Sequence, residues 1–236
     1  NDFNLKTAEM DLLNRISNAF HAKNKKVVVI INAGGVIETA SWRDKADAIL
    51  LAWQPGMEAG NAVTDVLSGK INPSGKLAST FPVKYEDDIT AKNFPGKQFP
   101  EKAVTGMFGM KAIPAEVTYE EGIYVGYRYY NTFNVKPAYE FGYGLSYTDF
   151  TYSNIKLSAA TMNKAITVTV DVTNTGKTNG REVVQLYISA PNGKTDKPAE
   201  ELKAFAKTSL LKPGQTEKVS FTVTTADVAS YNTDAS

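Results

Sequence analysis

Residues 48–82 read AILLAWQPGMEAGNAVTDVLSGKINPSGKLASTFP, and this stretch decides the fold of the first part of the chain. It begins with a short apolar run at residues 49–53, which has the length of a buried strand. Pro55 and Gly56 end that run, because proline supplies no N–H group and glycine permits a positive φ. A helical pattern follows and stops at Gly69. Strand, turn and helix in this order indicate an α/β domain.

Glu58 falls in the first turn of this predicted helix. A carboxylate there interacts favourably with the helix dipole and with the free N–H groups of the first turn. We therefore assign Glu58 a structural role, together with Pro55 and Gly56. Residues 72–75, Asn-Pro-Ser-Gly, are expected to form a tight turn after the helix.

The preceding residues fit the same domain. Apolar residues at helical spacing predict a helix within residues 2–24, capped by Thr7, and the β-branched run at residues 27–31 predicts a parallel strand. Residues 37–42 are interpreted as a short helical connection. Two parallel strands are too few for a self-sufficient sheet. We therefore expect a partial parallel sheet with an open edge, whose missing strands precede residue 1.

The last part of the chain has a different hydrophobic pattern, with a period of two from residue 150 onward. Turn residues such as Pro213-Gly214 separate the runs. Short alternating strands with turns between them predict an all-β sandwich. The alternating runs lie at residues 166–172, 183–188, 202–205 and 219–223.

In the middle of the chain, residues 85–118 form a long, poorly periodic stretch, which is uncommon unless a segment is functional or connects domains. One interpretation is a rim over an active site, with Phe94, Phe99 and Phe108 as candidate substrate-binding residues. The other is a linker across the domain junction. Residues 119–147 are rich in tyrosine and predict an aromatic interdomain arm. We divide the chain into residues 1–84, 85–149 and 150–236.

Composition narrows the possible partners. The formal net charge of +1 gives no indication of a nucleic-acid partner, and the longest apolar run is far too short to span a bilayer. The chain has no cysteine, which excludes disulfides and thiolate metal sites but leaves the compartment open. A single histidine, His21, cannot form a multi-histidine metal site. We expect no cofactor, no metal, no nucleic acid and no membrane partner, and we prefer an extracytoplasmic location.

Adjacent acidic residues are poor candidates for a catalytic pair. Neighbouring residues on a strand face opposite ways, so their carboxylates cannot flank one bond without special geometry. We interpret these groups as solvated charge. They are Glu86-Asp87-Asp88, Glu120-Glu121 and Glu200-Glu201.

Three motifs resemble glycoside hydrolase family 3, the β-glucosidase group. They are WQPGMEAG with DVLSGKINPSGKLASTFP at residues 53–82, YEEGIYVGYRYY at residues 119–130 and AYEFGYGLSYT at residues 138–148. The resemblance covers most of the chain, but it matches the C-terminal part of such an enzyme. It implies the end of the second, α/β domain followed by a fibronectin type III-like, or immunoglobulin-like, sandwich that stops short of a final hairpin.

The resemblance implies a retaining β-glucosidase that releases terminal non-reducing β-D-glucosyl residues from β-glucosides or oligosaccharides. Retention needs two carboxyl groups about 5 Å apart. In the family, the nucleophile is an Asp of an N-terminal (β/α)8 barrel, and the acid/base Glu of the second domain precedes the region that matches Asn1. Neither motif occurs here. The resemblance therefore implies no catalytic residue in this chain, an inactive isolated chain and the missing barrel as its partner.

Two alternatives remain. The chain could act by itself as a non-catalytic carbohydrate-binding or scaffold module. It could also be a complete enzyme whose site is assembled from the acidic residues named above. Activity of the isolated chain on an aryl β-glucoside separates the last alternative from the other two interpretations.

Overall fold

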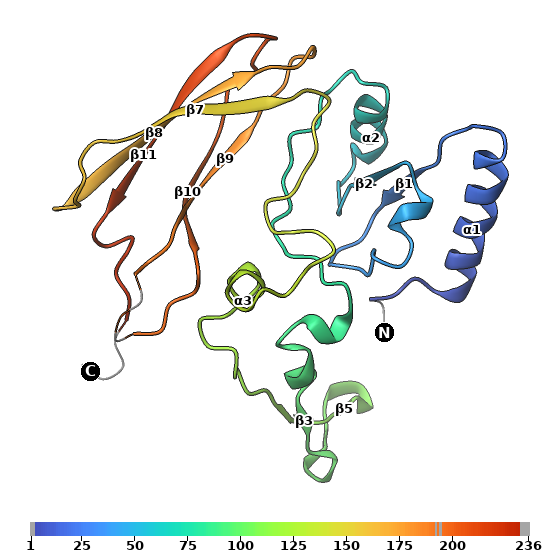
Figure 1. The fold of residues 1–236 in the computed structure, drawn as a ribbon. Helices are drawn as coiled ribbons and strands as arrows, with labels where there is room; N and C mark the ends of the chain where they lie inside the picture. Colours follow the sequence, from blue (N-terminus) through green and yellow to red (C-terminus); the bar gives the residue numbers. More distant parts are fainter. Residues whose placement is uncertain (1–2, 192, 194, 232–236) are drawn as a thin grey trace.

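The computed structural model describes residues 3–191, 193 and 195–231. Figure 1 shows an α/β region near the N-terminus, a β-sandwich that contains the C-terminal strands, and connecting segments that run between them. A third feature projects from the end of the molecule opposite α2, where β3 and β5 are labelled. We call this projection, residues 97–116, the finger.

The α/β region contains a two-stranded parallel sheet with helices on either side of it (Figure 1). In the sheet, Val28 lies opposite Ala48 and Ile31 lies opposite Leu51. This confirms the prediction of a parallel pair. The elements of the region, in chain order, are α1 (Thr7–His21), β1 (Val28–Ile31), β2 (Ala48–Leu51) and α2 (Ala59–Leu67).

The sheet is incomplete within the described residues, where β1 and β2 pair with no other strand. Val28 and Ile30 of β1 remain exposed, although parallel strands are normally covered on both faces. An apolar stripe on α1, made of Leu12, Ile16 and Phe20, is also exposed. The open edge was predicted from the sequence, whereas the uncovered helix stripe was not.

Two local predictions for the residues before β2 are wrong. Lys6, rather than Thr7, is the N-cap of α1, and its backbone N–H donates to Glu9 Oε2 at 2.8 Å. Residues 37–42 form no helix, because the Glu38 side chain accepts hydrogen bonds from the backbone N–H and the hydroxyl of Ser41. A one-turn 3₁₀ helix, η1 (Arg43–Lys45), follows instead.

Residues 72–75 do not form the tight turn that was predicted. The Asn72 side chain could close a local turn, but it is used at long range. Its Oδ1 accepts from Ser146 Oγ and from the Tyr147 N–H, both at 2.9 Å, and its Nδ2 donates to the Asn179 carbonyl at 3.0 Å. Asn72 therefore ties the end of the α/β region to the aromatic segment and to the sandwich.

The sandwich has five described strands in two antiparallel sheets, which confirms the predicted fold class. One sheet has the order β11-β8-β7 and the other pairs β10 with β9. Val172 and Leu211 are fully buried at the centre of the core. The prediction that final strands are missing concerns residues after Tyr231, which lie outside the described residues. The strands are β7 (Phe150–Leu157), β8 (Ala165–Asn174), β9 (Val183–Ile188), β10 (Glu201–Lys207) and β11 (Thr216–Thr224).

The finger is built from two short antiparallel ladders and 3₁₀ turns rather than from the structureless loop that the sequence suggested. β3 pairs with β6 near the base, and β4 pairs with β5 near the tip. At the tip, the Gly106 N–H donates to the Met110 carbonyl at 2.7 Å. The elements are β3 (Lys97–Gln98), η4 (Pro100–Lys102), β4 (Val104–Thr105), η5 (Met107–Gly109), β5 (Lys111–Ala112) and β6 (Ala115–Glu116).

Candidate functional site

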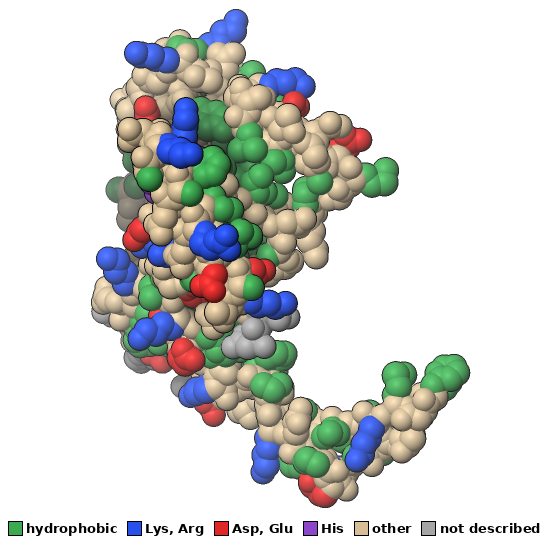
Figure 2. All heavy atoms as spheres, turned by 90° about the vertical axis from the view of Figure 1, so that its right-hand side faces the viewer, with side chains coloured by type: hydrophobic (Ala, Val, Ile, Leu, Met, Phe, Trp, Pro, Cys, Tyr) green, Lys and Arg blue, Asp and Glu red, His purple; other side chains and the backbone are tan. Residues whose placement is uncertain are grey.

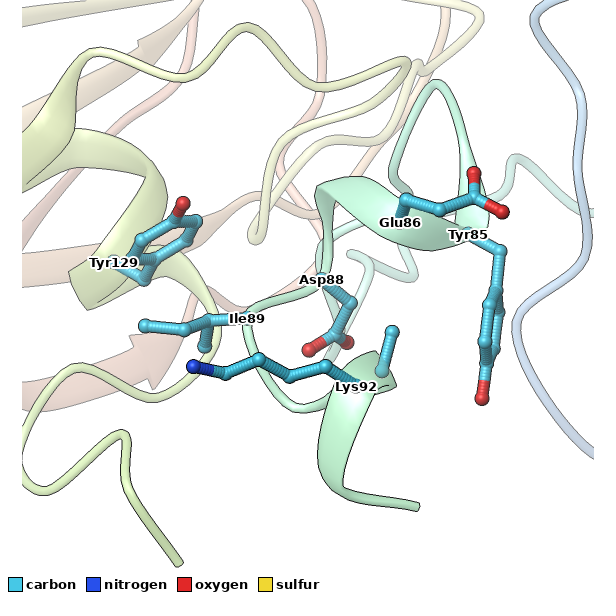
Figure 3. A pocket seen from close by; sticks show the side chains of 7 residues that line it. Tyr85, Glu86, Asp88, Ile89, Lys92 and Tyr129 are labelled. Atoms are coloured by element: carbon cyan, nitrogen blue, oxygen red, sulfur yellow. The ribbon is translucent and has the colours of Figure 1, made fainter. Parts of the chain in front are cut away.

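Residues 85–92, which precede the finger, and Tyr129 line an open hollow of about 520 Å³. Two 3₁₀ turns, η2 (Tyr85–Asp87) and η3 (Ala91–Asn93), form one wall, and α3 (Tyr127–Phe133) forms another. Figure 3 shows aromatic, acidic and basic side chains around this space. The labelled lining residues are Tyr85, Glu86, Asp88, Ile89, Lys92 and Tyr129.

Asp88 and Lys92, two of the charged residues that line the hollow, are engaged in local bonds. Asp88 Oδ1 accepts hydrogen bonds from the N–H and hydroxyl of Thr90 at 2.9 and 2.8 Å. Lys92 Nζ lies 2.7 Å from Glu120 Oε2, and this hydrogen bond lowers the pKa of Glu120 and raises that of Lys92. In Figure 3 the Glu86 carboxylate points away from that of Asp88. The hollow therefore presents polar groups but not the opposed carboxyl pair that glycoside hydrolysis needs.

The three candidate rim residues lie at different levels of the projection. Phe94 is exposed just before its base, and Phe108 is 91% exposed at its tip. Phe99 lies between them, and the ammonium groups of Lys97 and Lys102 lie 5.4 and 4.6 Å from its ring centroid. The lysines occupy positions over the ring that a stacked sugar would need. None of the three rings lines the hollow, and their role in substrate binding stays a prediction.

Glu58 occupies the N-cap position of α2, but its carboxylate does not cap the helix. Its Oε2 accepts instead from Asn61 Nδ2 at 2.5 Å. The reason is local: Glu58 has φ −89° and ψ 16°, whereas a capping side chain normally needs an extended backbone to reach the free N–H groups. The prediction that the Glu58 carboxylate caps α2 is therefore wrong. Gly56 has a positive φ of 72°, as a glycine in this turn was expected to have.

The acidic pair Glu200-Glu201 is held by separate partners. Glu200 accepts a hydrogen bond from Asn131 at 2.7 Å. Glu201 lies 3.1 Å from the ammonium group of Lys203 and 3.5 Å from the guanidinium group of Arg128. These carboxylates therefore connect α3 to the start of β10, and their neighbours hold them in structural contacts.

His21 lies in a chain of hydrogen bonds that sequence reasoning missed. Its Nδ1 is 3.1 Å from Ser17 Oγ, and its Nε2 is 2.9 Å from Asp47 Oδ2. The order resembles a catalytic triad. However, Ser17 is 5% exposed and its hydroxyl donates to the Lys45 carbonyl at 2.8 Å, so it is not presented to a substrate. These hydrogen bonds fasten α1 to the residues before β2.

Asp47 is the centre of this fastening. Lys26 Nζ lies 2.7 Å from Asp47 Oδ1, and the Val27 N–H donates to Asp47 Oδ2 at 2.8 Å. The hydrogen bond from Lys26, followed by those from Val27 and His21, lowers the pKa of the Asp47 carboxyl group. Over the described part of the chain, no three metal-binding side chains come together, and no helix is long and apolar enough to cross a membrane.

The tyrosine-rich residues 119–147 form a packing seam between the two folded regions. The ring of Tyr127 lies 4.9 Å from Phe141 and 5.7 Å from Tyr187 of β9, measured between centroids. Its hydroxyl accepts from the Leu202 N–H at 2.7 Å. These contacts support the interpretation of the segment as an aromatic interdomain arm.

A charged contact at the same junction could not have been found from the sequence. Lys76 Nζ lies 3.2 Å from Glu182 Oε1, with side chains 18% and 11% exposed, and it also donates to the Gly144 carbonyl at 2.7 Å. Tyr152 donates to the same Glu182 oxygen at 3.1 Å. The cluster joins the α/β region, the aromatic segment and the sandwich through residues that are far apart in sequence.

Comparison with known families gives two matches. The glycosyl hydrolase family 3 C-terminal domain matches residues 1–127, and the fibronectin type III-like domain matches residues 182–236. Together they agree with the α/β region and the sandwich of Figure 1.

Individual relatives match most of this chain. Beta-glucosidase A from Butyrivibrio fibrisolvens is 39% identical over 98% of this chain and 28% of its own length. Beta-glucosidase B from Emericella nidulans is 44% identical over 88% of this chain and 24% of its own length. The solved structure of beta-glucosidase 3B from Thermotoga neapolitana in complex with glucose is 50% identical, with a TM-score of 0.88, over 98% of this chain and 30% of that one. The chain therefore spans about a quarter to a third of the length of these relatives.

Proposed function

We propose a function from the premise that this chain belongs to glycosyl hydrolase family 3: it is the C-terminal portion of a retaining β-glucosidase. The complete enzyme would release terminal non-reducing β-D-glucosyl residues from β-glucosides or oligosaccharides. The observation that carries the proposal is the match of nearly the whole chain, at 50% identity, to less than a third of a beta-glucosidase whose structure contains glucose.

The catalytic carboxylates lie, in this proposal, in the part of the enzyme that precedes the chain. The local bonds of Asp88, Glu120, Glu200 and Glu201 support this, because carboxylates held by cations, a hydroxyl group and an amide group are poorly placed to form an opposed catalytic pair. We assign this chain the task of supporting that site from outside. Pro55, Gly56 and Glu58 shape the turn before α2 and have no chemical role in this account.

The exposed apolar surfaces of the α/β region also support the proposal. The α1 stripe of Leu12, Ile16 and Phe20 would pack against further helices or strands, and the β1–β2 sheet would extend at an open edge. Large apolar surfaces left in water are costly and mark interaction sites. The partner that we propose is the preceding portion of the enzyme, with its (β/α)8 barrel and the remaining strands of the α/β domain.

A stand-alone carbohydrate-binding module is the other candidate, and the contacts of the aromatic rings argue against it. Tyr127, Tyr139 and Phe141 are used in ring packing within the chain, and lysines flank Phe99. Phe108 is exposed, but it is surrounded in the sequence by methionines rather than by further aromatic residues.

The experiment is a full-length chimera in which this chain replaces the corresponding part of the Thermotoga neapolitana relative. We expect the chimera to hydrolyse an aryl β-glucoside and the isolated chain not to. The matched control is the relative truncated at the same junction, which should be inactive because it lacks the supporting domain. A folded chimera without activity, or a truncated relative with full activity, would contradict the proposal.

A further inference from the structure

The tip of the finger carries an apolar surface that nothing in the described part of the chain covers. Met107 is 77% exposed and Phe108 is 91% exposed. The tip strands β4 and β5 pair with each other, two residues on each side, with no sheet beyond them. The exposed large hydrophobic side chains at the tip are Val104, Met107, Phe108, Met110 and Ile113.

A projection of this kind is poorly supported by its own contacts. An isolated two-stranded hairpin is marginally stable in water, and the two ladders of the finger have two residue pairs each. Its apolar side chains gain little while they face solvent, because hydrophobic stabilisation depends on apolar area removed from water. A partner that covers the tip would supply the missing burial.

The shape of the molecule indicates where such a partner lies. Figure 2 shows the finger leaving the body at its lower end and curving outward, with hydrophobic side chains gathered at its free end. Further hydrophobic side chains gather on the body above it and border the same open space (Figure 2). One large neighbour could contact both surfaces, whereas a small ligand could not.

The chemistry of the tip favours protein over carbohydrate. Sugars are recognised by aromatic faces combined with polar groups, whereas the tip combines one phenylalanine with methionine, valine and isoleucine. Methionine is flexible and polarizable and adapts well to a packed protein surface. Acidic side chains do not lie among the tip residues 103–113, so a strongly basic partner is not favoured either.

We infer that the finger docks on the portion of the enzyme that precedes this chain. Residues 104–113 then form a clamp that holds that portion against this chain. The inference rests on the proposed function for the identity of the partner. Two observations favour this partner over a second copy of the chain. First, the alignment to a solved chain more than three times as long spans 98% of the residues of this chain. Second, the open edge of the β1–β2 sheet and the exposed α1 stripe are surfaces that further parts of the same enzyme would cover.

Hydrogen exchange tests the inference in the chimera described above and in the isolated chain. We expect the amides of residues 104–113 to exchange at least tenfold more slowly in the chimera than in the isolated chain. The triple variant Met107→Ser, Phe108→Ser, Met110→Ser should remove that difference and lower the thermal unfolding midpoint of the chimera. It should leave the midpoint of the isolated chain unchanged, which shows that the variant still folds.

A matched control changes polar residues at the same place. Thr105→Ser with Lys111→Ser should leave exchange and both midpoints as they are. Equal exchange rates in chimera and isolated chain would overturn the inference, as would a concentration-dependent dimer of the isolated chain that the triple variant abolishes. An active chimera with an unprotected tip would refute the clamp alone, and an inactive chimera with a protected tip would refute the proposed function alone.

Discussion

Lys92 and Glu120 join the two chain segments at the base of the finger, with Lys92 Nζ 2.7 Å from Glu120 Oε2. Both side chains are largely exposed, so the pair adds little to global stability. We predict that Glu120→Gln leaves the thermal unfolding midpoint unchanged and speeds amide exchange in the finger severalfold. The double variant Lys92→Glu with Glu120→Lys should restore the slow exchange. If the finger amides of Glu120→Gln exchange as slowly as those of the parent, the ion pair does not hold the finger.

The Lys76–Glu182 pair at the domain junction is much less exposed and has a different expected effect. Removing one partner of a buried pair leaves the other charge without compensation. We predict that Glu182→Ala lowers the free energy of unfolding by about 3 kcal/mol, measured by urea denaturation. Glu182→Gln keeps an oxygen that can accept from Tyr152 and Lys76, and should cost less. Equal losses in the two variants would contradict this account of the junction.

Gly144 allows two backbone segments to approach closely at the same junction. A Cβ added there would lie 2.3 Å from the Gly75 carbonyl oxygen, which is backbone and cannot move aside cheaply. We predict that Gly144→Ala destabilises the chain by roughly 1–3 kcal/mol. Gly75→Ala is the matched control, because a Cβ at Gly75 meets nothing within 4 Å. The measurement is the thermal unfolding midpoint of each variant, which should be lower for Gly144→Ala than for Gly75→Ala. Similar midpoints would disprove the argument that the two backbone segments approach too closely for a Cβ at residue 144.

The lowered pKa of Asp47 makes the stability of the α/β region depend on pH in the acid range. Its pKa is lowered in the folded state, so its contribution to stability is present above the unfolded pKa of about 3.9 and is lost as the pH falls below that value toward the folded pKa. We predict that Asp47→Asn is less stable than the parent at pH 7 and that the difference narrows in strong acid.

The measurement for Asp47 is urea unfolding at neutral pH and at two values below the unfolded pKa. Asp44→Asn is the control, because Asp44 is 96% exposed and lies 4.0 Å from its nearest cation. A constant difference between the parent and Asp47→Asn across this range would mean that the carboxylate bonds to Lys26, Val27 and His21 do not stabilise the fold.

The sequence predicted those features that depend on local periodicity. The β-branched run before Ile31 and the alternation around Val170 each specify a strand by themselves, and Gly69 marks the end of α2. The residues that organise the junction carry no such signal. Asn72 was expected to turn the chain locally, but its side chain bonds residues more than 70 positions away.

The candidate site was predicted less well for related reasons. The strands of the finger are two residues long, which is too short for a period to be seen. Phe99 was chosen for its aromatic ring, and no local pattern around it indicates that lysines lie over its face. Glu58 was placed correctly at the start of α2, yet its backbone conformation prevents the capping bond that its position suggested. The incomplete sheet of the described α/β region, by contrast, was predicted from the count of parallel strands.

The central claim is that this chain supports a catalytic site that it does not contain. The most direct measurement is the hydrolysis of 4-nitrophenyl β-D-glucopyranoside by the isolated chain, purified free of other chains and assayed beside the full-length chimera. The account predicts turnover by the chimera and none above the buffer rate by the isolated chain. A rate from the isolated chain that equals that of the chimera would contradict it.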